Sequence, residues 1–190
     1  MKYRLFVLTF LFSAVGWAQT SSLRAYLLNP EMRFERANSQ EMMDRRPLNI
    51  ALGYQKEKFS ILAEYARFEE DTGNATSSLD RTHQDVVVWF RYHFLNRIDK
   101  QSLSTTTLFA GAGAGAYEEQ VVTTLMGVSR TDKTPTKFMS GFVVGAEFSI
   151  LMNPHFGFVF GAEGRGLLAS DFDPNPVWSA LLRLGIQAPL

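Results

Sequence analysis

Apolar side chains recur at every second position along most of the chain after residue 20, which is the period of a β-strand. Large apolar residues alternate with small or polar ones in eight runs, which cover residues 22–29, 47–55, 60–68, 85–94, 107–122, 140–150, 156–167 and 177–190. An even number of antiparallel strands can close into a barrel that has no free edge. The pattern therefore predicts an all-β fold of about eight strands, each with one apolar and one polar face.

The connections between these runs alternate in length. Short turns are expected near residues 56–58 and 152–155, with a moderate link over 95–105. Longer polar loops are expected over 35–46, 69–84, 127–137 and 169–176. Short turns at one end and long polar loops at the other are typical of an up-and-down outer-membrane barrel.

Ionisable residues stand in the middle of the polar strand faces. They are Arg24, Glu64, Arg91, Glu147, Glu163, Arg165 and Arg183. In a soluble barrel these charges would face water and the apolar faces would line a cavity, whereas in a membrane barrel the apolar faces meet lipid and the charges fill the lumen. Because the interior of an eight-stranded barrel is too narrow for the many aromatic residues of the apolar faces, we predict the membrane arrangement. The seven charges are then expected to form a structural network of ion pairs.

Glycine occupies every second position in the stretch TLFAGAGAGAYEEQVV. If its alanines face lipid, Gly111, Gly113 and Gly115 face inward, beside the expected lumen residues Trp89 and Arg91. Glycine would make room there for the larger side chains. It would also permit the strong curvature that a small barrel needs.

The N-terminal segment has the features of a secretory signal peptide. Lys2 and Arg4 precede an apolar run over 5–15, and Gly16 and Ala18 occupy the −3 and −1 positions of a cut before Gln19. We therefore expect residues 1–18 to be a cleaved signal peptide and 19–190 to be the barrel domain.

Composition narrows the choice of partners. The 190 residues carry 19 basic and 19 acidic side chains and no cysteine. A net charge of zero gives no electrostatic reason to expect nucleic acid. The absence of cysteine removes disulfides and thiolate chemistry. No cofactor is expected.

Taken together, the signal peptide, the alternating strands, the FAGAGAGAY stretch and the C-terminal alternation resemble the small eight-stranded outer-membrane β-barrel superfamily of Gram-negative bacteria. That superfamily includes the OmpA transmembrane domain and the OmpX-like and OmpW-like proteins. The resemblance implies an integral outer-membrane location, contact with membrane lipid and lipopolysaccharide, and insertion by the barrel-assembly machinery. Two features depart from it: the chain ends in Ala188, Pro189 and Leu190 rather than an aromatic residue, and Pro30 predicts a bulge or an early strand end.

Some barrels of this superfamily are enzymes that modify lipid acyl chains with a Ser/His/acid constellation. None of the three histidines, His83, His93 and His155, stands in a His-x-Ser arrangement on a strand. The best triad that the sequence offers is His83, in an expected loop, with Ser77, Ser78, Asp80 and Asp85 nearby. Asp171 and Asp173 supply calcium-like oxygen donors, but without the spacing of an EF-hand.

We therefore predict a non-catalytic membrane barrel with a structural or surface-interaction role and no metal site. Three alternatives stay open: a lipid-modifying enzyme, a narrow channel, and a secreted soluble barrel that binds a hydrophobic ligand. The sequence does not specify a partner for the surface loops.

Overall fold

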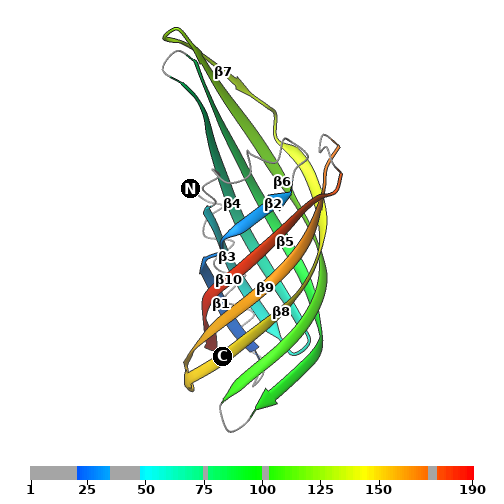
Figure 1. Cartoon of the computed structure of the whole chain (residues 1–190). Helices are drawn as coiled ribbons and strands as arrows, with labels where there is room; N and C mark the ends of the chain where they lie inside the picture. Colours follow the sequence, from blue (N-terminus) through cyan, green and yellow to red (C-terminus); the bar gives the residue numbers. More distant parts are fainter. Residues whose placement is uncertain (1–20, 35–47, 75–76, 100–102, 171–174) are drawn as a thin grey trace, which may run out of the picture.

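The computed structural model describes residues 21–34, 48–74, 77–99, 103–170 and 175–190. It is an antiparallel barrel whose strands follow each other around the wall in the order β1-β3-β4-β5-β6-β8-β9-β10, with β10 paired back to β1 (Figure 1). The eight-stranded up-and-down barrel predicted from the sequence is confirmed. The strands are β1 (Ser21–Leu28), β2 (Glu31–Phe34), β3 (Leu48–Lys56), β4 (Phe59–Asn74), β5 (Ser77–Asp99), β6 (Ser104–Leu125), β7 (Val128–Lys133), β8 (Lys137–Asn153), β9 (Phe156–Leu168) and β10 (Val177–Pro189). The expected signal peptide and the pair Asp171 and Asp173 lie outside the described residues.

β1 and β2 are two parts of one barrel strand, because both pair with β10. The break falls at Asn29 and Pro30, and Leu182 still donates its N–H to the carbonyl of Pro30 at 3.0 Å. Of the two outcomes expected at Pro30, the strand break is present, whereas the bulge lies earlier, between Tyr26 and Leu28, where the pairing with β10 shifts by one residue. This extra residue changes the inward positions from Arg24 and Tyr26 to Glu31 and Arg33 in β2.

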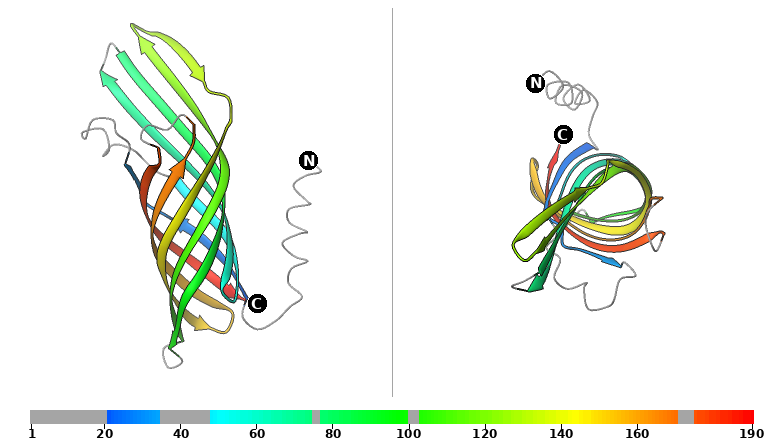
Figure 2. Two further views of the ribbon diagram at one scale, coloured as in Figure 1. Left: turned by 90° about the vertical axis from the view of Figure 1, so that its right-hand side faces the viewer. Right: turned by 90° about the horizontal axis from the view of Figure 1, so that it is seen from above.

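Two hairpins extend the barrel wall at one end (Figure 2). β4 and β5 stay paired from Arg67↔Gln84 up to Asn74↔Ser77, and β7 folds back along β6 from Gln120↔Lys133 to Leu125↔Val128. The polar loops expected over 69–84 and over the first part of 127–137 are therefore wrong. The physical reason is that hydrogen bonds between the paired strands satisfy the backbone N–H and C=O groups of these segments. Their polar side chains can stay in water, so a strand forms there without an apolar face.

The turn between β6 and β7 is a tight two-residue connection. Met126 and Gly127 both have positive φ, at 49° and 82°. Two consecutive positive φ values match the type I′ turn, whose twist fits that of the flanking strands.

The opposite end of the barrel has short connections and holds the first and last described strand ends. Ser22 pairs with Pro189, and Leu190 donates its N–H to the carbonyl of Ser21 at 2.9 Å. The expected short turns lie at Glu57–Lys58 and Pro154–His155. Among the described residues there is no helix long and apolar enough to cross a membrane.

The two faces of each strand differ in polarity as the alternation predicts. On β10, Arg183 is 0% exposed and points inward, whereas the next residue, Leu184, is 40% exposed and points outward. On β5 the outward apolar positions run from Val86 to Phe94, which spans about 27 Å along the strand, or about 20 Å across a membrane at a tilt near 40°. That height is close to the apolar band of roughly 25 Å found on outer-membrane barrels.

The inward glycines of β6 make room for Trp89, as predicted. A Cβ placed on Gly113 would lie 2.5 Å from the Trp89 ring, and one on Gly141 of β8 would lie 3.1 Å from it. The Trp89 ring therefore lies against the wall that β6 and β8 form. At Gly111 and Gly115 the same Cβ would meet a backbone oxygen of β5 at 2.1 and 2.0 Å, so these glycines also permit a close approach of the two strands.

Candidate functional site

The lumen holds a continuous set of ion pairs. All seven charged residues expected there are buried, and they come from six different strands. Consecutive partners have N···O distances of 2.5–3.1 Å in the series Arg24–Glu147, Glu147–Arg91, Arg91–Glu163, Glu163–Arg183, Arg183–Glu64 and Glu64–Arg165. Arg165 binds both oxygens of Glu64 at 2.6 Å, the fork geometry that gives arginine its strong carboxylate pairs. The alternation of Arg and Glu leaves each charge beside opposite charge.

Three further ionised residues continue this network toward the extended hairpins, and the sequence analysis missed them. Arg33 binds Glu31 at 3.0 Å and Asp85 at 2.5 Å, while Glu31 lies 4.0 Å from Arg165. The described part of the lumen thus carries five arginines and five acids. Asp85 could have been found from its polar-face position, whereas Glu31 and Arg33 change face because of the bulge.

Neutral side chains donate further hydrogen bonds to the buried carboxylates. Asn49 donates to Glu31 at 2.9 Å and to Glu64 at 2.8 Å, and the Tyr26 hydroxyl donates to Glu147 at 2.8 Å. Because a buried charge is costly unless it is both paired and hydrogen-bonded, these donors contribute to holding the ionised form.

Aromatic rings stack on four of the five guanidinium groups. The distances from the guanidinium carbon to the ring centroid are 3.9 Å for Arg33 over Phe68, 4.6 Å for Arg91 over Phe109, 4.9 Å for Arg165 over Trp89 and 5.1 Å for Arg183 over Tyr26. Cation–π contacts of this kind stabilise a desolvated cation. The rings and the ion pairs therefore lie together in the interior of the barrel.

A strand-borne Ser/His pair is present near the end with the short turns, although no local motif in the sequence revealed it. The Ser60 hydroxyl and the His93 Nε2 are 2.9 Å apart across β4 and β5. His93 is buried and its ring centroid lies 5.6 Å from that of Phe109. The pair is formed by strands that are neighbours in space, so a search for His-x-Ser could not find it.

The triad proposed around His83 takes a different form. His83 lies on β5 rather than in a loop, and its ring stacks on Tyr117 with centroids 5.3 Å apart. Its Nε2 is 3.4 Å from Asp85, while Asp80 is exposed on the opposite face of the strand. The described residues include no group of three or more His, Asp or Glu side chains placed to bind a metal ion.

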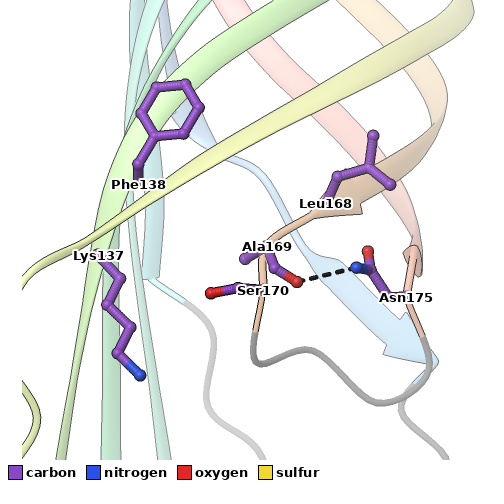
Figure 3. A pocket seen from close by; sticks show the side chains of 6 residues that line it. All are labelled: Lys137, Phe138, Leu168, Ala169, Ser170 and Asn175. Atoms are coloured by element: carbon purple, nitrogen blue, oxygen red, sulfur yellow. Dashed lines mark hydrogen bonds between the residues drawn. The ribbon is translucent and has the colours of Figure 1, made fainter.

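An open recess of about 550 Å³ lies at the end of the barrel that carries the extended hairpins (Figure 3). β8 and β9 are paired only from Ser140↔Leu168 onward, and the recess lies beyond that pair. Asn175 donates to the Ala169 carbonyl at 2.9 Å, and both residues line the recess. Its lining residues are Lys137, Phe138, Leu168, Ala169, Ser170 and Asn175.

Comparisons with solved structures identify the fold. Neisserial surface protein A superposes with a TM-score of 0.57 at 17% identity, over 90% of this chain and 97% of that one. Ail, the attachment invasion locus protein of Yersinia pestis, crystallised with the heparin analogue sucrose octasulfate, superposes with a TM-score of 0.51 at 16% identity, over 91% of this chain and 100% of that one. This chain has the fold of the small outer-membrane barrels. The resemblance inferred from the sequence is therefore confirmed at the level of fold.

Sequence comparison adds nothing to this result, since no protein-family profile and no curated protein matches the chain.

Proposed function

We propose that the chain is an integral outer-membrane barrel with a structural or surface-interaction role and no catalytic activity. The observation that carries the proposal is the inverted polarity of the barrel, with buried Arg183 inside and exposed Leu184 outside. Apolar strands facing outward suit lipid, and a closed ladder leaves no backbone group unpaired in the hydrocarbon. The same inversion argues against a soluble barrel with an apolar cavity.

Membrane lipid and lipopolysaccharide are the proposed contacts of the outward apolar band. The ends of the strands support this assignment: Trp178 is exposed on β10 beside Phe142, with ring centroids 5.4 Å apart. Aromatic residues prefer the interface between hydrocarbon and water. Insertion by the barrel-assembly machinery belongs to the same proposal, with Leu190 in the outward position where related barrels carry an aromatic residue.

The Ser60–His93 pair is the observation that favours the rival enzyme. It lies inside the lumen, where Arg91 and Phe109 occupy the adjacent space. A lipid acyl chain bound at the pair would have to share this space with the Arg91 and Phe109 side chains. We therefore propose that the pair is a structural hydrogen bond, and we propose for the same reason that the lumen does not conduct solutes.

Lipid quenching of single cysteines tests the membrane assignment in this cysteine-free chain. Leu184→Cys and Ser179→Cys place a fluorophore on opposite faces of β10 without removing a charge. After reconstitution, a lipid-borne quencher should reduce the signal at position 184 and not at 179. Equal quenching at both sites, or a protein that stays in the aqueous phase, would overturn the proposal.

Labelling of intact cells tests the location and orientation. Met126→Cys lies at the apex of the extended hairpin and Met152→Cys at the opposite end, and both side chains are exposed. A membrane-impermeant maleimide should label position 126 in intact cells and position 152 only after the outer membrane is opened. The reverse pattern would contradict the proposed orientation.

A further inference from the structure

The apex of the β6–β7 hairpin presents large apolar side chains to solvent. Leu125 is 59% exposed, Met126 88% and Val128 74%. Leu125 and Val128 are direct cross-strand partners, so their side chains share one face, and Met126 stands in the turn itself. Tips of surface hairpins usually carry small or polar residues, which makes this concentration of apolar surface informative.

The apex is held in one shape by its backbone. Met126 and Gly127 form the tight type I′ turn, and six consecutive residue pairs hold β7 against β6 below it. On the opposite face of the hairpin, Thr124 and Ser129 hydrogen-bond each other at 2.9 Å. Since these hydroxyls already pair across the strands, moving the apex out of water costs less than it would for free hydroxyls.

The apex itself carries no charge. Residues 121–129 contain no ionisable side chain. The charges near it are exposed Asp80, which lies across from Val122 on β5, and the pairs Arg81–Glu119, Arg130–Asp132 at 3.1 Å and Lys133–Glu118 at 2.7 Å. These residues leave no excess of positive charge beside the apex, so its partner should be recognised by apolar contact rather than by attraction to anionic groups.

The apex lies well beyond the last residue pair of β8, with β5 alongside β6 as far as Ser77↔Leu125. β6 pairs with β8 as far as Tyr117↔Lys137, and Leu125 lies eight residues further on, about 27 Å along the strand. A bilayer's headgroup layer is only about 5–8 Å deep on each side of the hydrocarbon. Figure 2 shows this hairpin extending beyond the rest of the barrel at one end. In the proposed membrane location, the apex would therefore project into the space outside the protein's own membrane.

We propose that this apex, Leu125–Val128, inserts shallowly into a second lipid bilayer that faces the cell surface. The apex is convex and offers only three large side chains. Their contact area is far below the roughly 800 Å² per partner that a stable protein interface needs. A fluid bilayer, in contrast, closes around a small apolar apex from any direction. The inference rests on the proposed membrane barrel, because the orientation of the barrel is what points the apex away from its own lipid.

The test uses the barrel held in nanodiscs and separately added vesicles. A Ser129→Cys reporter labelled with an environment-sensitive fluorophore sits beside the apex, and the vesicles of phosphatidylcholine, alone or with phosphatidylglycerol, carry a quenching lipid. Quenching should appear with both vesicle types and change by less than about twofold between 0.05 and 0.5 M salt, because charge does not contribute. Met126→Asp should reduce vesicle partition by about tenfold or more. The matched control, Met152→Asp at the other end of the barrel, should leave it unchanged.

The outcomes separate this inference from the proposed function. If the Leu184 probe is quenched by the nanodisc lipid but the Ser129 probe ignores added vesicles, the apex inference is wrong and the barrel stands. The inference would also be overturned if Met126→Asp left the vesicle partition unchanged. Dimers that form through the apex without vesicles would overturn it too, and would indicate a second copy of the chain as the partner. Failure of the Leu184 probe itself would remove both proposals.

Discussion

Glu64 holds two arginines at once, so its replacement by glutamine tests whether the lumen network stabilises the barrel. It accepts hydrogen bonds at 2.6 Å and 2.6 Å from Arg165, at 2.5 Å from Arg183 and at 2.8 Å from Asn49. Glutamine keeps the shape of the side chain and removes its charge, and its NH₂ group then faces a guanidinium. Arg165 and Arg183 both keep Glu163 as a partner, at 2.9 and 2.5 Å. Breaking a buried pair on one side typically costs 3–5 kcal/mol.

Because Glu163 compensates in part, we expect Glu64→Gln to lower the free energy of unfolding by about 3 kcal/mol, or roughly a hundredfold in the unfolding equilibrium. Urea unfolding in lipid vesicles, followed by tryptophan fluorescence, measures this change. The matched control is Glu69→Gln on the same strand, where the pair with Arg67 is half exposed and should contribute at most about 1 kcal/mol. Equal effects of the two substitutions would refute the idea that the lumen pairs stabilise the barrel.

Three other perturbations follow from the described contacts. Gly113→Val drives a side chain into the Trp89 ring, so it should destabilise the barrel by about 1–3 kcal/mol and shift the tryptophan emission. The control Gly164→Ala, with no atom within 4 Å of its Cβ, should change neither the stability nor the emission. Equal behaviour of the two variants would contradict the packing described. Ser60→Ala should cost about 1 kcal/mol of stability through the lost bond to His93, and lipid analysis of cells with either protein should be identical; a change in acyl chains would revive the enzyme. Raising salt from 0.1 to 1 M should change the unfolding free energy by less than about 1 kcal/mol, since buried pairs are weakly screened; a marked loss in the same urea assay would mean that the network is solvated.

The sequence predicts the barrel well because period-two alternation survives in every wall strand. The same alternation places Arg183 inside and Leu184 outside, and it assigned all seven predicted charges to the buried face. These assignments need only local information, namely the parity of a residue within its strand.

What the sequence could not predict depends on contacts between distant segments or on a change of parity. The bulge between Tyr26 and Leu28 moves Glu31 and Arg33 to the inward face, and continuing the parity of Arg24 would put them outside. Ser60 and His93 meet only because β4 and β5 pair in one register. The extended hairpins were taken as loops because residues outside a membrane need no apolar face, so the alternation that marks a strand is absent.

The lumen network also has a consequence for how the barrel is made. Glu64 on β4 has one arginine partner on β9 and another on β10, so its set of ion pairs is complete only after the last strand arrives. A partly assembled sheet would expose unpaired carboxylates and guanidinium groups to lipid, which costs about 2–4 kcal/mol for an arginine at the middle of a bilayer. The ion pairs of Arg24 on β1 and Arg183 on β10 therefore complete the network where the barrel closes. In the proposed membrane location, the interior would favour membrane entry of the complete barrel over fragments of it.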